Sequence, residues 1–133
     1  MRNYTKIDRE KLLKDYSESD NFKEVHFRSD KNQPIWKAYS IAYVQASGHY
    51  VKFFYKRGAP TCRLESISVL ITLLDPRIFL FCHRSYIINL FYLKSYWTQG
   101  ERIVAKTIDG DEIPVSHDAV DKFKTLMQPY IEQ

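Results

Sequence analysis

The stretch FCHRSYIIN, residues 81–89, sets a histidine, an arginine and a serine side by side within an otherwise apolar run. In an extended strand His83 and Ser85 would share one face, roughly 7 Å apart along the chain. A serine nucleophile needs a nearby histidine, an acid that orients this histidine and often a sharp turn such as GxSxG. Neither an acid nor that motif lies near Ser85 in the sequence. The pair therefore does not predict catalysis.

The other residues that could do chemistry form no known enzyme motif either. Cys62 and Cys82 lack CxxC partners, and the sequence contains no P-loop and no dinucleotide-binding glycine motif. Asp111 and Glu112 are adjacent carboxylates, but they flank a turn signal, where solvation accounts for them. The histidines, which lack the spacing of a metal site, are His26, His49, His83 and His117. We expect no enzymatic activity, no metal, no cofactor and no small-molecule substrate.

Positive charge gathers in the middle of the chain. Residues 31–100 contain nine basic and two acidic side chains, a net charge of 9 − 2 = +7. Residues 1–30 are neutral overall, and residues 101–133 carry 4 − 7 = −3. A concentrated basic region is typical of a nucleic-acid-binding surface. A solvated surface on which charges happen to cluster is the alternative that composition leaves open.

Length and composition predict one small domain that is rich in strands. A chain of 133 residues is expected to form a single domain. Aromatic residues make up 15% of the chain, and they suit the half-buried faces of a sheet. The N-terminus is too charged for a signal peptide, and no apolar run approaches the roughly 20 residues of a membrane helix. We therefore expect a cytoplasmic protein with reduced thiols.

The N-terminal segment differs from the rest of the chain in its charge and in the spacing of its apolar residues. Residues 1–22 are strongly charged, and Leu12, Leu13 and Tyr16 would share one face if this segment were helical. We interpret it as a charged N-terminal arm with helical tendency. Beyond it, apolar and polar residues alternate with a period of two, as in half-buried strands, so residues 23–133 are predicted to be the folded domain.

Short strands joined by tight turns dominate this predicted domain. Turn signals occur at Ser47-Gly48, Gln99-Gly100 and Asp109-Gly110. An apolar stripe predicts a short helix at residues 66–74, and Ser116 is placed to cap a C-terminal helix. Strands are predicted at residues 25–28, 35–36, 41–46, 50–57, 61–64, 79–84 continuing into 86–90, 93–97, 102–108 and 112–115. We expect a mostly β fold of antiparallel sheets with one short internal helix and a C-terminal helix.

Residues 79–116, FLFCHRSYIINLFYLKSYWTQGERIVAKTIDGDEIPVS, closely resemble the core of the LytTR family of bacterial DNA-binding domains. The resemblance rests on HRSYxxN followed by DGxx[IL]PVS. IAYVQASGHYVKFFYKRG (residues 41–58) and ISVLITLLDPRIF (residues 67–79) resemble the family's opening strands and short helix. The likeness covers about residues 25–128. It implies an elongated β–β–β sandwich in which loops, rather than a recognition helix, read the major groove.

The resemblance implies DNA contacts from three loops. The matching positions, expected to face base edges, are His49, Arg84 and His117. Arg84 can present two parallel donors to guanine O6 and N7. The positions expected to neutralise phosphates are Lys52, Lys56, Arg57 and Arg63. An ordinary turn residue at His49 and a solvated strand face at Lys52 and Lys56 are the alternatives.

The residues of the HRS motif have separate expected roles. His83 and Ser85 share a face and are interpreted as local hydrogen-bonding residues that shape the junction of strand and loop, while Arg84 faces the other way, toward DNA. Asn89 completes the structural part of the motif. Two departures from the family pattern weaken the expected grip on the backbone. They are His117 and Phe81, which stand where family members often have a basic residue.

Double-stranded DNA is therefore the expected partner, bound sequence-specifically by a transcription regulator at paired repeats with a second copy of the chain. Family members are commonly response regulators of two-component systems, but the residues ahead of the domain are too few to hold a receiver. We expect an isolated DNA-binding fragment or a receiver-less regulator; the start at Met1 favours the second, with control by a membrane partner. A protein-interaction module with a basic surface and a binder of RNA or single strands are the rival hypotheses.

Overall fold

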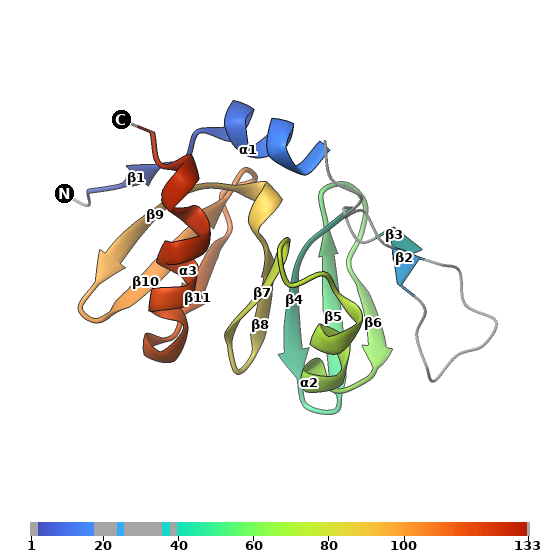
Figure 1. Ribbon diagram of the computed structural model, residues 1–133. Coiled ribbons are helices and arrows are strands. Elements are labelled where there is room, and N and C mark those ends of the chain that lie inside the picture. The colour runs from blue at the N-terminus through green and yellow to red at the C-terminus, as the bar shows by residue number, and fades with distance from the viewer. Residues whose placement is uncertain (1–2, 18–23, 26–35, 38–39, 133) are drawn as a thin grey trace.

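The computed structural model describes residues 3–17, 24–25, 36–37 and 40–132, and two antiparallel sheets form most of this part (Figure 1). A third, small sheet pairs β2 (Glu24–Val25) with β3 (Trp36–Lys37). The rest of the strands predicted at 25–28 and 35–36 lies outside the described residues, and so does His26. The expected mostly β fold, with antiparallel sheets, a short internal helix and a C-terminal helix, is confirmed.

The larger sheet has the strand order β6-β5-β4-β8-β7 and is antiparallel throughout. Burial alternates along its outer strands β5 and β6, because one face of such a sheet packs on a core while the other can meet solvent, whereas β4 is buried on both faces over residues 41–44. In the strand after the first turn, Val51 and Phe53 are buried whereas Tyr50 is exposed. The strand bounds are β4 (Ile41–Ser47), β5 (Tyr50–Tyr55), β6 (Thr61–Leu64), β7 (Phe79–His83) and β8 (Tyr86–Asn89).

The second sheet has the order β1-β9-β10-β11 and is also antiparallel. Its two hairpins turn at Gly100 and Gly110, whose φ angles of 63° and 94° lie in the left-handed region that favours glycine. Both turns match the predicted signals. The strand bounds are β1 (Thr5–Lys6), β9 (Leu93–Gln99), β10 (Arg102–Thr107) and β11 (Glu112–Val115).

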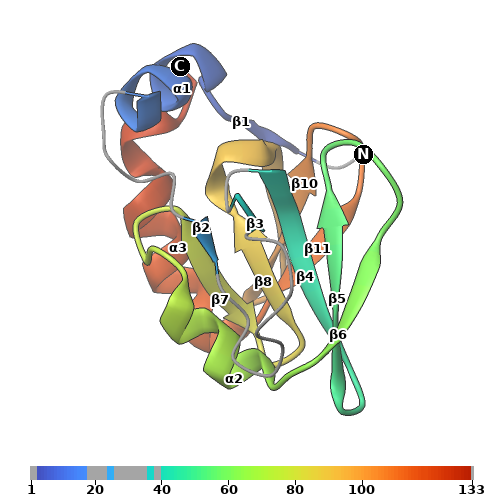
Figure 2. The same cartoon turned by 90° about the vertical axis from the view of Figure 1, so that its right-hand side faces the viewer.

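Two helical segments cover the sheets on the same side of the molecule (Figure 2). The helix predicted at 66–74 is a single α-helical turn, α2 (Ile67–Leu70), continued by the 3-10 helix η2 (Ile71–Leu73). Leu70 is fully buried. The C-terminal helix is α3 (Val120–Met127), whose Phe123 packs edge-to-face on a tyrosine of β9 with ring centroids 5.0 Å apart.

Ser116 does not cap the last helix through its side chain, so that prediction was wrong. Its Oγ donates a hydrogen bond to the carbonyl oxygen of Cys82 (3.2 Å), and its backbone N–H donates to the same oxygen (2.8 Å). The 3-10 turn η4 (His117–Ala119) separates it from α3. The hydroxyl is drawn away because the end of β11 packs against β7, and Ser116 ties these two strands together.

The run at residues 79–90 is not one continuous strand, as the prediction had it. His83 at the end of β7 pairs with Tyr86 at the start of β8, and the chain reverses between them. Leu90 begins the 3-10 helix η3 (Leu90–Tyr92) instead of extending the strand. Most two-residue hairpins turn through positive φ angles, but no described residue other than glycine has one. A register shift between Phe81 and His83 adjusts the two strands to this different turn.

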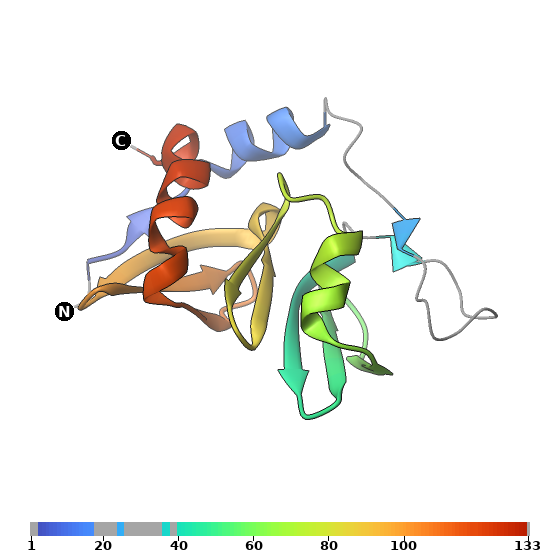
Figure 3. The same ribbon diagram turned by 60° about the horizontal axis from the view of Figure 1, so that its bottom comes forward.

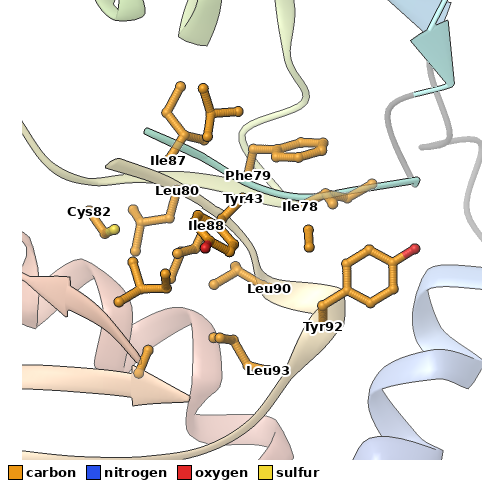
Figure 4. Close-up of a cluster of buried hydrophobic side chains, with 14 of the residues drawn as sticks. Tyr43, Ile78, Phe79, Leu80, Cys82, Ile87, Ile88, Leu90, Tyr92 and Leu93 are labelled. Atoms are coloured by element: carbon orange, nitrogen blue, oxygen red, sulfur yellow. The ribbon is translucent and has the colours of Figure 1, made fainter. Parts of the chain in front are cut away.

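The β7–β8 hairpin forms the edge of the larger sheet that faces the second sheet, and it supplies the centre of the core (Figures 3 and 4). Leu80, Ile87 and Ile88 are at most 2% exposed. The polar side chain among them is Asn89, which is fully buried and bonded at both ends of its amide: Nδ2 donates to the Ile41 carbonyl oxygen, and Oδ1 accepts from the Phe91 N–H, both at 2.9 Å. Because both halves of the amide have partners, Asn89 joins β4 to the end of β8 without leaving a buried polar atom unsatisfied.

Residues 3–17 pack on the rest of the described structure. The helix predicted for the N-terminal segment is α1 (Arg9–Ser17), and β1 pairs with β9 ahead of it. Leu12 is fully buried in the core. Arg9 anchors the start of the helix, because its Nη1 donates to the carbonyl oxygens of Phe91 (2.8 Å) and Leu93 (2.7 Å).

Candidate nucleic-acid interface

The β4–β5 turn presents His49 to solvent. Ser47 and Tyr50 are the last paired residues, so Gly48 and His49 form the two-residue turn. Gly48 has a φ of 60°, which a side chain would make unfavourable, and this explains the glycine at that position. His49 is exposed beside it. The expected loop position is thus at the tip of a short, well-defined hairpin.

The β7–β8 turn presents Arg84 in the same way. The backbone N–H of Ser85 donates to Nδ1 of His83 (3.1 Å), and the His83 ring packs edge-to-face on Tyr86 with centroids 5.6 Å apart. Arg84, between the two hydrogen-bonded residues, is exposed. His83 and Ser85 thus hydrogen-bond to each other at the junction that they are expected to shape. They do so by closing a turn rather than by sharing a strand face.

The protonation of His83 suits this role. Burial lowers its pKa, and the positive charges of Arg84 and Arg102 lower it further. Since Nδ1 accepts the Ser85 N–H, the neutral ring carries its proton on Nε2. Near neutral pH His83 is therefore uncharged. It stabilises the turn through Nδ1, and its Nε2–H is a further hydrogen-bond donor.

His117 begins η4 and is flanked by two carboxylates. Its Nε2 lies 3.6 Å from Oε2 of Glu101, in the β9–β10 turn, and its Nδ1 lies 3.8 Å from Oδ1 of Asp118. All three side chains are more than half exposed. Asp118 is next to His117 in the sequence, but Glu101 is an acidic neighbour that the sequence pattern did not indicate, because it comes from another hairpin.

Backbone hydrogen bonds hold these turns at one end of the molecule, the lower edge in Figure 1. The Ala46 N–H donates to the Ser85 carbonyl oxygen (2.8 Å) and so ties the first hairpin to the second. The Ser116 N–H donates to the Cys82 carbonyl oxygen (2.8 Å) and ties the second hairpin to η4. The structure therefore brings the exposed side chains of His49, Arg84 and His117 to a common end.

The four expected phosphate contacts are not all at this end. Arg63 lies opposite Val51, near the β4–β5 turn, and Lys52 is one residue further along β5, with Nζ 5.2 Å from the Phe54 ring centroid. Lys56 and Arg57 follow the opposite end of β5. At about 3.3 Å per strand residue, they lie roughly 23 Å or more from His49.

Arg102 is a basic residue at this end that the sequence did not single out. It begins β10, is exposed, and lines a cleft of about 320 Å³ together with His83 and Arg84. It falls just outside the basic region at residues 31–100, so the charge map along the chain excluded it. Only the approach of β10 to the β7–β8 turn places it beside the expected site.

No group of three or more metal-binding side chains occurs among the described residues. Both cysteines are free; Cys62 is exposed and Cys82 is buried. Burial raises the pKa of the Cys82 thiol to about 12, and its single S–H has two carbonyl oxygens as acceptors within reach, those of Tyr86 (3.6 Å) and Pro114 (3.5 Å). In the part of the chain that the structure describes, no helix is long and apolar enough to cross a membrane.

Comparison with known proteins agrees with this architecture. The model of the LytTr DNA-binding domain matches residues 34–128, most of the chain, and the protein belongs to this family of DNA-binding domains. A solved LytTr DNA-binding domain from Bacillus cereus superposes with a TM-score of 0.65 at 17% identity, over 81% of this chain and 97% of that one, which confirms the fold.

A curated relative is the CO-responsive transcriptional regulator RcoM of Rhodospirillum rubrum. It is 32% identical over 89 residues, which cover 65% of this chain and 37% of that protein. The chain thus spans little more than a third of the length of this relative.

Proposed function

We propose that this protein is a transcription regulator that binds duplex DNA sequence-specifically, with His49, Arg84 and His117 entering successive major grooves. The observation that supports this best is the common end at which two hydrogen-bonded hairpin turns and η4 expose these side chains. A major groove about 12 Å wide admits such turns without a recognition helix. Membership of a DNA-binding family agrees with the proposal.

Arg84 is the proposed centre of sequence reading. Its guanidinium can donate two parallel hydrogen bonds to guanine O6 and N7. The Ser85 N–H to His83 Nδ1 bond fixes the backbone on either side of it, so less conformational entropy is lost when the side chain meets a base. His49 and His117 would make the flanking contacts, as donors or acceptors according to their tautomers.

Phosphate contacts are proposed for the basic side chains along the sheet. Lys52 and Arg63 are near enough to the β4–β5 turn to meet the backbone of the same groove. Lys56 and Arg57, at the far end of β5, would meet phosphates only where the DNA bends along the sheet. We propose such bending, with a second copy of the chain on an adjacent repeat and a membrane partner as the source of control.

The rival function is a protein-interaction module. Tyr50 and Leu64, which pair across β5 and β6, favour it, because they are 52% and 60% exposed and form an apolar spot beside the basic residues. An acidic partner with an apolar anchor would suit such a surface.

A titration with duplexes distinguishes the two. Gel-shift or anisotropy measurements at two salt concentrations should show tight binding to duplexes selected from genomic DNA and weaker, strongly salt-dependent binding to random duplexes. An absence of duplex binding at low salt would overturn the proposed function. Equal or tighter binding to single strands of the same sequence would instead support the single-strand hypothesis.

A further inference from the structure

A polar cleft opens where the two large sheets meet at the DNA-facing end. It has a volume of about 320 Å³, and its lining includes His83 and Arg84 from the β7–β8 hairpin and Gln99 and Arg102 from the β9–β10 hairpin. The two arginines thus come from different sheets. They do not belong to one sequence motif, since they are 18 residues apart along the chain (102 − 84).

The charged side chains that line the cleft are both hydrogen-bond donors. Arg84 and Arg102 are permanently positive, and both act on His83, since their charges lower its pKa. His83 is neutral and holds its proton on Nε2, because Nδ1 accepts the Ser85 N–H. Among the residues that the structure describes, no carboxylate is part of the lining. Glu101, which precedes Arg102 in the sequence, lies 3.6 Å from His117.

We propose that this cleft binds one phosphate of the DNA backbone, with Arg102 as its main anchor. The inference rests on the proposed duplex binding and adds a contact that is independent of base identity. A phosphodiester has two acceptor oxygens, which suits the forked guanidinium of Arg102, with the His83 Nε2–H and the Gln99 amide as further donors. Arg84 remains directed at the bases in this proposal. Its positive charge still attracts the phosphate, while its hydrogen-bond donors stay available to a base.

A phosphate at this point would join the two sheets through the DNA. Arg102 extends from the β1-β9-β10-β11 sheet, whereas the base-reading turns at His49 and Arg84 belong to the other sheet. A contact that carries no sequence information can therefore fix the register of the reading turns in the groove. Arg102 is a positioning residue for base recognition in this scheme.

The first test compares Arg102→Ala with wild type on a duplex that the wild-type chain selects from a random pool and on a scrambled duplex. We expect Arg102→Ala to weaken both by a similar factor, about five- to tenfold at low salt, and to reduce the salt slope by about one unit. Lys11→Ala is the matched control, because it removes one exposed positive charge on α1 at the opposite end (Figure 1). It should change neither value appreciably.

The second test locates the phosphate. Single neutral methylphosphonates are placed in turn along the selected duplex, and binding of wild type and Arg102→Ala is measured for each. One position should weaken wild type but not Arg102→Ala, because the variant has already lost that contact. Two outcomes would overturn this inference and leave duplex binding intact. In the first test, Arg102→Ala would bind with the same affinity and the same salt slope as wild type; in the second, every methylphosphonate would weaken both proteins equally. If wild type binds no duplex, both the proposed function and this inference are wrong.

Discussion

The backbone N–H of Ser85 donates a hydrogen bond to Nδ1 of His83, with 3.1 Å between the two nitrogens, and this bond closes the turn that carries Arg84. The His83 ring also packs on Tyr86, which fixes its orientation. The apolar strand pair at the edge of the larger sheet thus ends in a turn with one exposed arginine. Two members of the polar triplet, His83 and Ser85, thus hold the turn that exposes the third.

Replacing Arg84 tests whether it reads bases. We expect Arg84→Ala to weaken binding to a selected duplex by about 1–3 kcal/mol and to relax the preference at one base pair, because two donors to a guanine would be lost. Competitive binding against duplexes with single substitutions measures both effects. Lys11→Ala, which removes an equal charge on α1, should keep the base preference. Unchanged preference and affinity in Arg84→Ala would show that this turn does not read DNA.

The pKa of His83 predicts a pH dependence of stability. In the folded protein this pKa is lowered by burial, Arg84 and Arg102, so the unfolded chain takes up the proton more readily. The stabilising contribution is present above the ordinary pKa of about 6.5 and is lost as pH falls through it toward the folded value. Thermal unfolding of wild type between neutral and mildly acidic pH should show this loss.

His83→Gln is the control for that measurement. Glutamine can still accept the Ser85 N–H through its side-chain oxygen but does not titrate in this range. We expect the variant to be somewhat less stable at neutral pH and to lose less stability on acidification. His117, with its two carboxylate neighbours, is the same in both proteins and therefore cancels in the comparison. Parallel pH profiles would contradict the assigned role of His83.

Asn89 is predicted to matter for stability. Asn89→Ala removes the side-chain partner of a buried carbonyl oxygen (Ile41) and of a partly buried N–H (Phe91), which should cost about 1–3 kcal/mol for each group that finds no new partner. Chemical denaturation measures this cost. Thr98→Ala, on the exposed part of β9, should change the unfolding free energy by less than about 0.5 kcal/mol. A similarly small change in Asn89→Ala would mean that the buried amide is replaceable.

Glu101 is predicted to oppose DNA binding. Its carboxylate lies 3.6 Å from His117 and at the end of the molecule proposed to face phosphates. Glu101→Gln should therefore raise duplex affinity by about two- to fivefold at low salt, with less effect at high salt, since exposed charges are screened. Glu132→Gln removes an exposed carboxylate near the C-terminus and should have little effect. Weaker binding in Glu101→Gln would indicate that this carboxylate contacts the bases.

The two cysteines should differ strongly in reactivity. Cys62 is exposed, whereas Cys82 is buried and its pKa is raised to about 12, so almost no thiolate forms at neutral pH. A thiol reagent should modify one cysteine rapidly and the second only as fast as the hairpin opens. Mass spectrometry of the labelled peptides identifies each site, and Cys62→Ser should abolish the fast phase. Fast labelling of Cys82 in that variant would show that the β7–β8 hairpin opens readily.

Local sequence signals were sufficient for much of the fold. Glycines at positions 48, 100 and 110 supply the positive φ of three turns, and alternating apolar residues set which strand faces are buried. Both are properties of short segments, so they can be read without knowing what packs against them. The β7–β8 turn was missed because Arg84 and Ser85 turn without a glycine and the run around them is apolar on both sides.

The sequence by itself was sufficient to predict the mostly β fold and the family to which the chain belongs. Tertiary structure alone decided which side chains share the candidate interface. Lys52 and Lys56 are four residues apart on one basic stretch, yet β5 carries Lys56 away from the turns. Arg102 and Glu101, distant in sequence, are brought beside Arg84 and His117 because the β9–β10 hairpin packs near the β7–β8 turn. The net charge of a stretch can be counted from the sequence, but the set of side chains on a binding surface depends on which strand ends come together in the fold.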